Sequence, residues 1–156
     1  MKHNLTETTL SVVIPVLNEA DYIADLLVAL AQQTYLPDEI SVADAGSTDG
    51  TVEIAEQHGA SIVRGGLPAV GRNAGAAAAT GDLILFLDAD VLPAPRFIET
   101  ILREFLQAKL DATTCLMQAI SDRQLYHLLH QVSNFYLIAI QKFSPHAPGF
   151  VILIRR

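Results

Sequence analysis

Residues 83–90, with the sequence LILFLDAD, join a continuous apolar run to two carboxylates, Asp88 and Asp90. An apolar run of this length, preceded by the turn residues Gly81 and Asp82, predicts a strand buried on both faces, as in a parallel sheet. Because ionised carboxylates are rarely buried unpaired, Asp88 and Asp90 are expected where the strand emerges. In open α/β folds that edge binds ligands, and carboxylate oxygens there suit Mg²⁺ or Mn²⁺ bridging to a phosphate. The alternative is a solvated Asp-x-Asp turn.

The composition is that of a globular protein. Hydrophobic residues make up 51% of the 156 residues and charged residues 17%, which indicates one domain with a substantial core. A net charge of −7 without a basic stripe argues against a nucleic-acid partner, because nothing is present to neutralise phosphates. The single cysteine, Cys115, excludes an internal disulfide and fits a reducing compartment. The N-terminus has no apolar signal core and no stretch reaches about 18 apolar residues, so a cytoplasmic protein without a membrane span is expected.

Apolar runs alternate with amphipathic segments along the chain. Strands are expected at residues 10–16, 39–43, 61–64, 83–87, 113–117 and 150–154. Helices are expected after Asn18 as an N-cap, from Ser47 or Thr48 to a stop at Gly59, over residues 68–80, and over residues 97–105. This alternation predicts an α/β fold with a mainly parallel sheet and helices on both faces.

Residues 125–139 carry a long stripe of large apolar side chains at helical spacing, including Phe135 and Tyr136. Core packing is the expectation for this helix. The alternatives are a subunit contact, or peripheral contact with a membrane in which a lipid-linked acceptor resides. A homo-oligomer that covers apolar surface around this stripe, Phe143 and Phe150 is also expected.

Three of the expected strands end in polar sequence. The first is followed by Asn18 and Glu19, the second by Asp44, and the fourth by Asp88 and Asp90. Because the carboxyl ends of parallel strands lie side by side, one crevice should collect all five side chains. Each loop taken alone is also explained as a helix cap or a turn, so their joint placement is the stronger signal.

Four motifs stand in order along the chain: VVIPVLNEA, VADAGSTDGT, VGRNAGAAAATGD and LILFLDADV. Together they resemble the nucleotide-sugar-binding half of family 2 glycosyltransferases, closely over residues 11–103 and more loosely over 149–156. The resemblance implies the Rossmann-like GT-A fold and one nucleotide-sugar-binding domain over residues 1–156, incomplete at its C-terminus. It also implies transfer of a sugar from a nucleotide-diphosphate sugar to an acceptor hydroxyl, with Mn²⁺ or Mg²⁺ as cofactor.

The resemblance also assigns roles to individual residues. It places Pro15, Asn18 and Glu19 against the nucleoside, Asp44 at the nucleobase edge, Arg72 and Asn73 beside the donor, Asp88 near the ribose, and Asp90 on the metal. Ala45 departs from the pattern, because many members carry a second aspartate there, and this leaves the preferred base open. The chemistry agrees independently, since an ion on Asp90 and the Arg72 guanidinium would stabilise charge on a departing diphosphate. The alternative for Arg72 is a solvated position on a helix.

The sequence offers no convincing general base. Glu99 and Glu104 are expected to be solvated on a helix, and Asp122 is expected to be a helix cap. The chain is therefore expected to transfer sugar weakly or not at all on its own, as the donor half of a longer enzyme or a naturally short protein. His127 and His130 are expected on a polar helix face, and His146 is an alternative partner of Asp90 on the metal.

Two other functions stay open. A non-catalytic module that binds a nucleotide or nucleotide sugar has the same donor-side residues. A phosphatase of the haloacid dehalogenase type matches FLDADV, with Asp88 as nucleophile and Asp90 as acid/base. That family needs a later lysine and a later acidic pair. The only later lysines are Lys109 and Lys142 and no acidic pair follows, which makes the phosphatase the more remote alternative.

Overall fold

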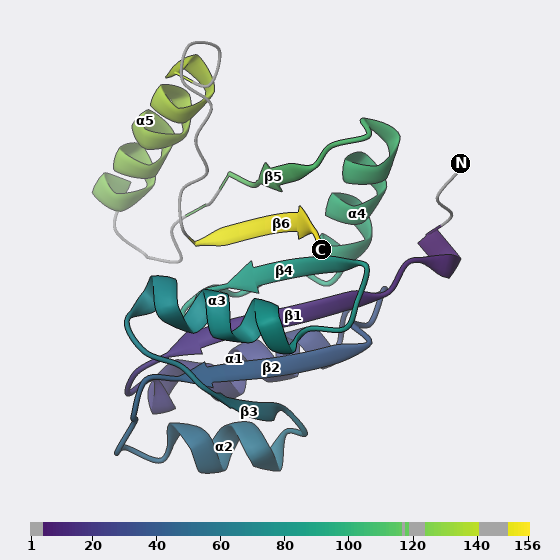
Figure 1. Ribbon diagram of the computed structural model, residues 1–156. Helices are drawn as coiled ribbons and strands as arrows, with labels where there is room; N and C mark the ends of the chain where they lie inside the picture. Colours follow the sequence, from purple (N-terminus) through teal and green to yellow (C-terminus); the bar gives the residue numbers. More distant parts are fainter. Residues whose placement is uncertain (1–4, 117, 119–123, 141–149) are drawn as a thin grey trace.

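The computed structural model describes residues 5–116, 118, 124–140 and 150–156, and this part of the chain contains a six-stranded sheet (Figure 1). The strands, in sheet order, are β3 (Ser61–Arg64), β2 (Glu39–Asp44), β1 (Leu10–Val16), β4 (Leu83–Leu87), β6 (Val151–Arg155) and β5 (Ala112–Thr114). Strands β1 to β4 pair in parallel, whereas β6 runs antiparallel to both β4 and β5. The expected mainly parallel sheet is confirmed.

Helices cover both faces of the sheet, and one further helix, α5 (Gln124–Ile140), stands apart from it (Figure 1). The helices on the faces are α1 (Ala20–Ala31), α2 (Thr51–Gln57), α3 (Pro68–Ala78) and α4 (Phe97–Gln107), and a short 3₁₀ helix, η1 (Leu5–Glu7), precedes β1. Along β1, Val12 and Ile14 belong to the large core with α1 and α4, whereas Val13 belongs to a smaller core beneath α3. All five residues of β4 are buried, as a strand covered on both faces requires.

Two glycines let α3 lie close to the sheet. A Cβ atom on Gly75 would stand 2.2 Å from Val13 Cγ1, and one on Gly71 would stand 3.3 Å from Pro15 Cβ. Glycine therefore allows an approach that a larger residue would prevent. Because α3 packs this closely on the sheet, Arg72, the residue after Gly71, lies at the carboxyl end of the sheet.

The starts of α1 and α2 differ from the expectation. Glu19, not Asn18, is the N-cap of α1, and α2 begins at Thr51, after the expected caps. Asp49 explains the difference, because its carboxylate accepts hydrogen bonds from the N–H of Ala20 at 3.0 Å and of Thr51 at 3.1 Å. One carboxylate thus satisfies the first amides of two helices. Asn18 instead adopts a left-handed conformation, with φ of 57°.

Helix α5 does not pack in the core, so that expectation is wrong. Its apolar side chains are exposed, with Phe135 74% exposed, and the helix stands apart from the sheet (Figure 1). The expected strand at 113–117 is shorter and ends at Thr114. His146, Phe143 and Asp122 lie outside the described residues. Within the described part of the chain, no helix has the length and hydropathy needed to cross a bilayer.

Candidate functional site

The carboxyl ends of β1, β2 and β4 meet at one edge of the sheet, as expected, because β1 lies between the other two. Val16 is paired with Asp44 across β1 and β2, and the Ala45 N–H donates to the carbonyl of Val16 at 2.9 Å. The loops that follow these strands therefore begin side by side. They supply most of the polar groups described below.

The loops after β1 and β2 are joined by reciprocal hydrogen bonds. The Asn18 N–H donates to Ser47 Oγ at 2.9 Å, and the Asn18 side-chain oxygen accepts from the Thr48 N–H at 2.9 Å. The Glu19 N–H donates to Thr51 Oγ1 at 2.8 Å. Asn18 is thus a bridge between loops rather than a helix cap. This bridge gives Glu19 a fixed backbone position at the edge of the sheet.

Asp44 also takes part in the structure of its own loop. Its carboxylate accepts hydrogen bonds from the Gly46 N–H at 3.0 Å and from the Ser47 N–H at 3.0 Å. Gly46 has a φ of 103°, which favours glycine in this turn. A carboxylate offers about four acceptor positions, so Asp44 keeps capacity for a ligand.

Arg72 and Asp88 form an ion pair at this edge. Arg72 Nη2 lies 2.5 Å from Asp88 Oδ1, and the two side chains are 20% and 31% exposed. The Asp88 N–H donates to the carbonyl of Phe150 at 3.0 Å, which ties the end of β4 to the start of β6. Burial raises the pKa of Asp88, although Arg72 opposes this shift, and Asp90 raises the pKa further.

Glu19 and Asp90 add further negative charge. Burial and then the nearby carboxylates of Asp90, Asp49 and Asp88 raise the pKa of Glu19. Asp90 itself is exposed at the rim. Neighbouring carboxylates that raise the pKa of Glu19 and Asp88 in this way favour a bound cation.

A divalent ion fits this donor set. The described residues contain no group of three or more His, Cys, Asp or Glu side chains arranged to hold a metal. Mg²⁺ is commonly bound through one or two carboxylates together with substrate phosphates and water, and hard oxygen ligands also suit Mn²⁺. Asp90 is the exposed carboxylate at this edge that meets that requirement, since Asp88 is paired with Arg72.

The two remaining expected residues flank the crevice. Pro15 is half-buried in β1 beneath α3, where its Cβ faces Gly71, and Asn73 is exposed on α3. The structure therefore brings Pro15, Asn18, Glu19, Asp44, Arg72, Asp88 and Asp90 to the carboxyl end of the sheet. Asn73 follows Arg72 on the same helix.

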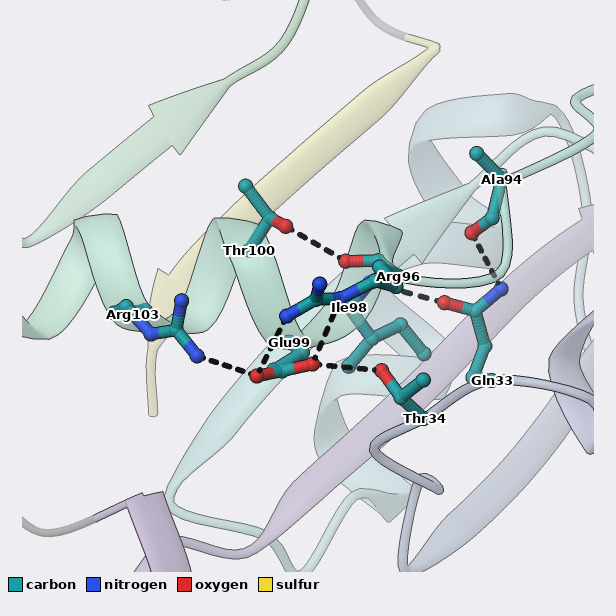
Figure 2. Close-up of polar contacts among 8 residues, drawn as sticks. All are labelled: Gln33, Thr34, Ala94, Arg96, Ile98, Glu99, Thr100 and Arg103. Atoms are coloured by element: carbon teal, nitrogen blue, oxygen red, sulfur yellow. Dashed lines mark hydrogen bonds and ion pairs between the residues drawn. The ribbon is translucent and has the colours of Figure 1, made fainter.

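Sequence reasoning missed Gln33, whose side chain is hydrogen-bonded to Ala94, in the segment between Asp90 and α4, and to Ile98 in α4 (Figure 2). Gln33 is 5% exposed; its amide nitrogen donates to the carbonyl of Ala94 at 2.8 Å, and its amide oxygen accepts from the Ile98 N–H at 3.0 Å. The Thr34 N–H adds a bond to the carbonyl of Pro95 at 2.9 Å. Gln33 also donates to the Ala29 carbonyl within its own segment at 3.2 Å, but its contacts with Ala94 and Ile98 span more than 60 residues, so no local pattern marks them.

The sequence predicted that Glu99 is solvated on a helix, but its carboxylate has several partners. Its carboxylate accepts from Thr34 Oγ1 at 2.9 Å and pairs with Arg96 and Arg103 (Figure 2). The Thr34 hydroxyl and then Arg96 lower the pKa of Glu99. Glu99 thus stabilises the junction between α1 and α4 and lies outside the candidate site.

Comparison with known proteins identifies the class. The model for glycosyl transferase family 2 matches residues 11–152, and the chain belongs to this family. The glycosyltransferase YibD of Escherichia coli, itself uncharacterized, is 34% identical over 113 residues, which are 68% of this chain and 33% of that protein. Glucosyl-3-phosphoglycerate synthase of Mycolicibacterium smegmatis is 36% identical over 63% of this chain and 36% of its own length.

Solved structures share the fold. Glucosyl-3-phosphoglycerate synthase from Mycobacterium tuberculosis, in complex with Mn²⁺, uridine diphosphate and glucosyl-3-phosphoglycerate, superposes with a TM-score of 0.68. That match covers 96% of this chain and 57% of the mycobacterial one at 23% identity. TarS of Staphylococcus aureus matches 74% of this chain and 22% of its own, with a TM-score of 0.62 and 26% identity. The chain thus has the GT-A fold and spans about a third of the length of these curated relatives.

Proposed function

We propose that residues 1–156 form one nucleotide-sugar-binding domain, the donor half of a glycosyltransferase that moves a sugar from a nucleotide-diphosphate sugar to an acceptor hydroxyl. The observation that carries the proposal is the grouping of Glu19, Asp88 and Asp90 with Arg72 at one edge of the sheet. These groups can hold a divalent ion and a diphosphate together. Family membership supports the same reaction class.

The resemblance to family 2 glycosyltransferases supplies the role that we propose for each residue. Asp44 accepts from the N–H edge of the base, and Pro15, Asn18 and Glu19 line the nucleoside side. Asp88 accepts from the ribose while it orients Arg72, and Asn73 adds a polar group beside the donor. Asp90 holds Mn²⁺ or Mg²⁺.

The chemistry requires stabilisation of a leaving group. The bond between the anomeric carbon and the phosphate oxygen breaks, and the nucleoside diphosphate departs with negative charge. The acceptor oxygen bonds to the anomeric carbon, and its hydroxyl proton passes to a general base. The bound ion supplies Lewis-acid stabilisation of the diphosphate. Arg72 supplies a fixed guanidinium, held by Asp88, whose N–H groups can donate to phosphate oxygens. We assign no residue of this chain as the general base.

Calorimetry tests the donor site directly. UDP and GDP are titrated into the protein with Mn²⁺ or with EDTA, and we expect binding that depends on the ion. UDP and Mn²⁺ are the first probes because the mycobacterial structure contains both. Asp90→Asn should weaken binding in Mn²⁺ by at least about 10- to 100-fold, comparable to the loss when even an outer-shell partner of a metal ligand is removed.

Asp111→Asn is the matched control, because the Asp111 side chain is 98% exposed and Asp111 directly precedes β5, at the edge of the sheet beyond β6. It should leave the affinity unchanged. Equal affinity in EDTA and in Mn²⁺ would refute the metal role of Asp90. A non-catalytic module would show the same binding without turnover, so release of UDP from a UDP-sugar donor separates the two functions. The phosphatase alternative receives no support from the comparisons.

A further inference from the structure

Helix α5 has two sides of opposite character, and its more polar side faces the rest of the protein. The partly buried residues of the helix recur at intervals of three, four and three, and three of the four are polar: His127, His130, Asn134 and Leu137. Tyr126 and His130 line a cavity that α1 and the segment after β4 also border. The polar side of α5 is therefore the side turned toward the protein.

The opposite side of α5 carries a stripe of large apolar side chains that no described element covers (Figure 1). These side chains are between 54% and 74% exposed: Leu125, Leu128, Leu129, Val132, Phe135 and Tyr136. An amphipathic helix normally buries such a stripe in the core of its own domain. In α5 the arrangement is inverted, so within the described part of the chain the stripe has no core to cover it.

The spacing within the stripe fits a second helix. Leu125, Leu128, Val132, Phe135 and Ala139 follow one another at intervals of three, four, three and four residues, as the a and d positions of a coiled coil do. We refer to these five residues as the α5 seam. The adjoining e positions are apolar as well. Side chains that interlock with a facing helix require this period, whereas a lipid surface requires only an apolar face.

The charge of the helix favours a second copy of α5 as the partner. Residues 124–140 contain no Asp, Glu, Lys or Arg, although the whole chain has a net charge of −7. Two copies of α5 can therefore meet without like charges in the contact. Helices that bind membrane surfaces are typically rich in Lys and Arg on the polar face, and α5 has neither.

We propose that the α5 seam pairs with the α5 seam of a second copy of this chain, across a two-fold axis near Val132, the midpoint of the seam. A helix of 17 residues is about 25 Å long, and two such seams bury on the order of 1,000 Å² in total. This area lies at the low end for specific interfaces, so we expect a dissociation constant of about 1–100 µM. The interface is separate from the donor edge and does not depend on the proposed function.

Analytical ultracentrifugation of the whole chain at about 1–500 µM should show a reversible equilibrium between monomer and dimer. Val132→Glu brings two carboxylates together near the two-fold axis and should weaken association at least about 100-fold. Ser133→Glu is the matched control, because it adds the same charge at the next exposed position of the helix, outside the seam. It should change the dissociation constant by no more than about threefold.

The single chain should fold normally in both variants, because Val132 is 59% exposed and Ser133 is exposed. Denaturant unfolding below the concentration of dimerisation checks this. A mixture of the Val132→Glu and Val132→Lys variants then tests whether the partner is the same helix. Each variant alone should be monomeric, whereas the equimolar mixture should associate again, because opposite charges then face each other.

Three results would overturn the proposal. They are a parent chain that stays monomeric up to about 500 µM, a dimer that Val132→Glu leaves intact, and a mixture of the two charged variants that does not associate. Phosphatidylcholine vesicles test the other occupant. Sedimentation of the parent with these vesicles, lost in Val132→Glu and seen without any dimer in their absence, would assign the seam to a lipid surface instead.

Discussion

The two ends of the sheet hold carboxylates in opposite ways. At the amino end of β1 and β2, Glu39 accepts hydrogen bonds from Ser11 Oγ at 2.5 Å and from the Thr80 N–H at 2.6 Å. Asp82 accepts from the N–H of Thr9 at 3.0 Å and from its hydroxyl at 2.8 Å. The Ser11 hydroxyl and then the Thr80 N–H lower the pKa of Glu39. These carboxylates are satisfied by the fold itself.

At the carboxyl end the direction is reversed for Glu19 and Asp88, whereas hydrogen bonds from Thr51 and Ala20 lower the pKa of Asp49. Burial and then the negative charge of Asp90 raise the pKa of Glu19, and burial raises the pKa of Asp88 despite Arg72. Asp90 is exposed at the rim. Glu39 at the amino end therefore stabilises the folded state when ionised, whereas Glu19 and Asp88 at the other end are less favourable as anions than in the unfolded chain. This contrast separates structural carboxylates from those available to a ligand.

The largest change in stability is expected at Gly75, between the two ends. Gly75→Ala should lower the free energy of unfolding by about 2–3 kcal/mol, because the new Cβ would overlap Val13 in a packed interface. It should also weaken UDP binding in Mn²⁺ by displacing Arg72. Denaturant unfolding and calorimetry measure the two effects. Ala77→Gly, at an exposed position of the same helix, should cost only about 1 kcal/mol.

A smaller loss is expected at the amino end. Glu39→Gln should lower the free energy of unfolding at pH 7 by about 1–2 kcal/mol, since charge-assisted hydrogen bonds become neutral ones. The folded-state pKa of Glu39 lies below 4.5, so its contribution is present above pH 4.5 and is lost as the pH falls through the folded pKa. The variant should therefore lose less stability on acidification than the parent between pH 7 and pH 3.

Glu104→Gln is the control for this pH dependence, because Glu104 is exposed on α4. It should change the free energy of unfolding by no more than about 0.5 kcal/mol. Parallel acid curves for the Glu39 variant and the parent would show that Glu39 does not act as a structural carboxylate.

The smallest effect, of opposite sign, is expected at the carboxyl end. Glu19→Gln should raise the free energy of unfolding at pH 7 by about 0.5 kcal/mol, because it removes one of several repelling charges. The folded-state pKa of Glu19 lies above 4.5, so the penalty is present above that pKa and is relieved as the pH falls through it. The gain should therefore disappear near pH 4, as denaturant unfolding at several pH values can show. A loss of stability at pH 7 would contradict the contrast between the two ends.

The sequence alone was sufficient to predict the four parallel strands and the polar residues that follow three of them. The apolar run of β4 and the β-branched run of β1 predicted central strands because a strand buried on both faces needs continuous apolar residues. The order of strands and helices then predicted which loops share an edge. Asp44, Asp88 and Asp90 followed from their places directly after those strands.

Other features depend on partners that are distant in the chain. Asp49 accepts hydrogen bonds from the first amides of both α1 and α2. Gln33 donates a hydrogen bond to the segment that follows Asp90. Local periodicity does not encode these bonds. Helix α3 packs closely on the sheet because Gly75 leaves space for the Val13 side chain, and only the packed structure shows this contact. These contacts were missed because hydrogen-bond partners and packing distances depend on strand order and register.

The sequence by itself determined an α/β domain and the residues that follow its strands, because residue type and periodicity record which segments are buried. Its four motifs also resemble glycosyl transferase family 2, to which the chain belongs. Only the tertiary structure decided that β6 enters antiparallel between β4 and β5, that α5 stays outside the core, and that Asn18 joins two loops. It also decided which carboxylates are saturated by donors and which repel one another. That distinction arises from distances between segments far apart in sequence, and these distances are set when the sheet assembles.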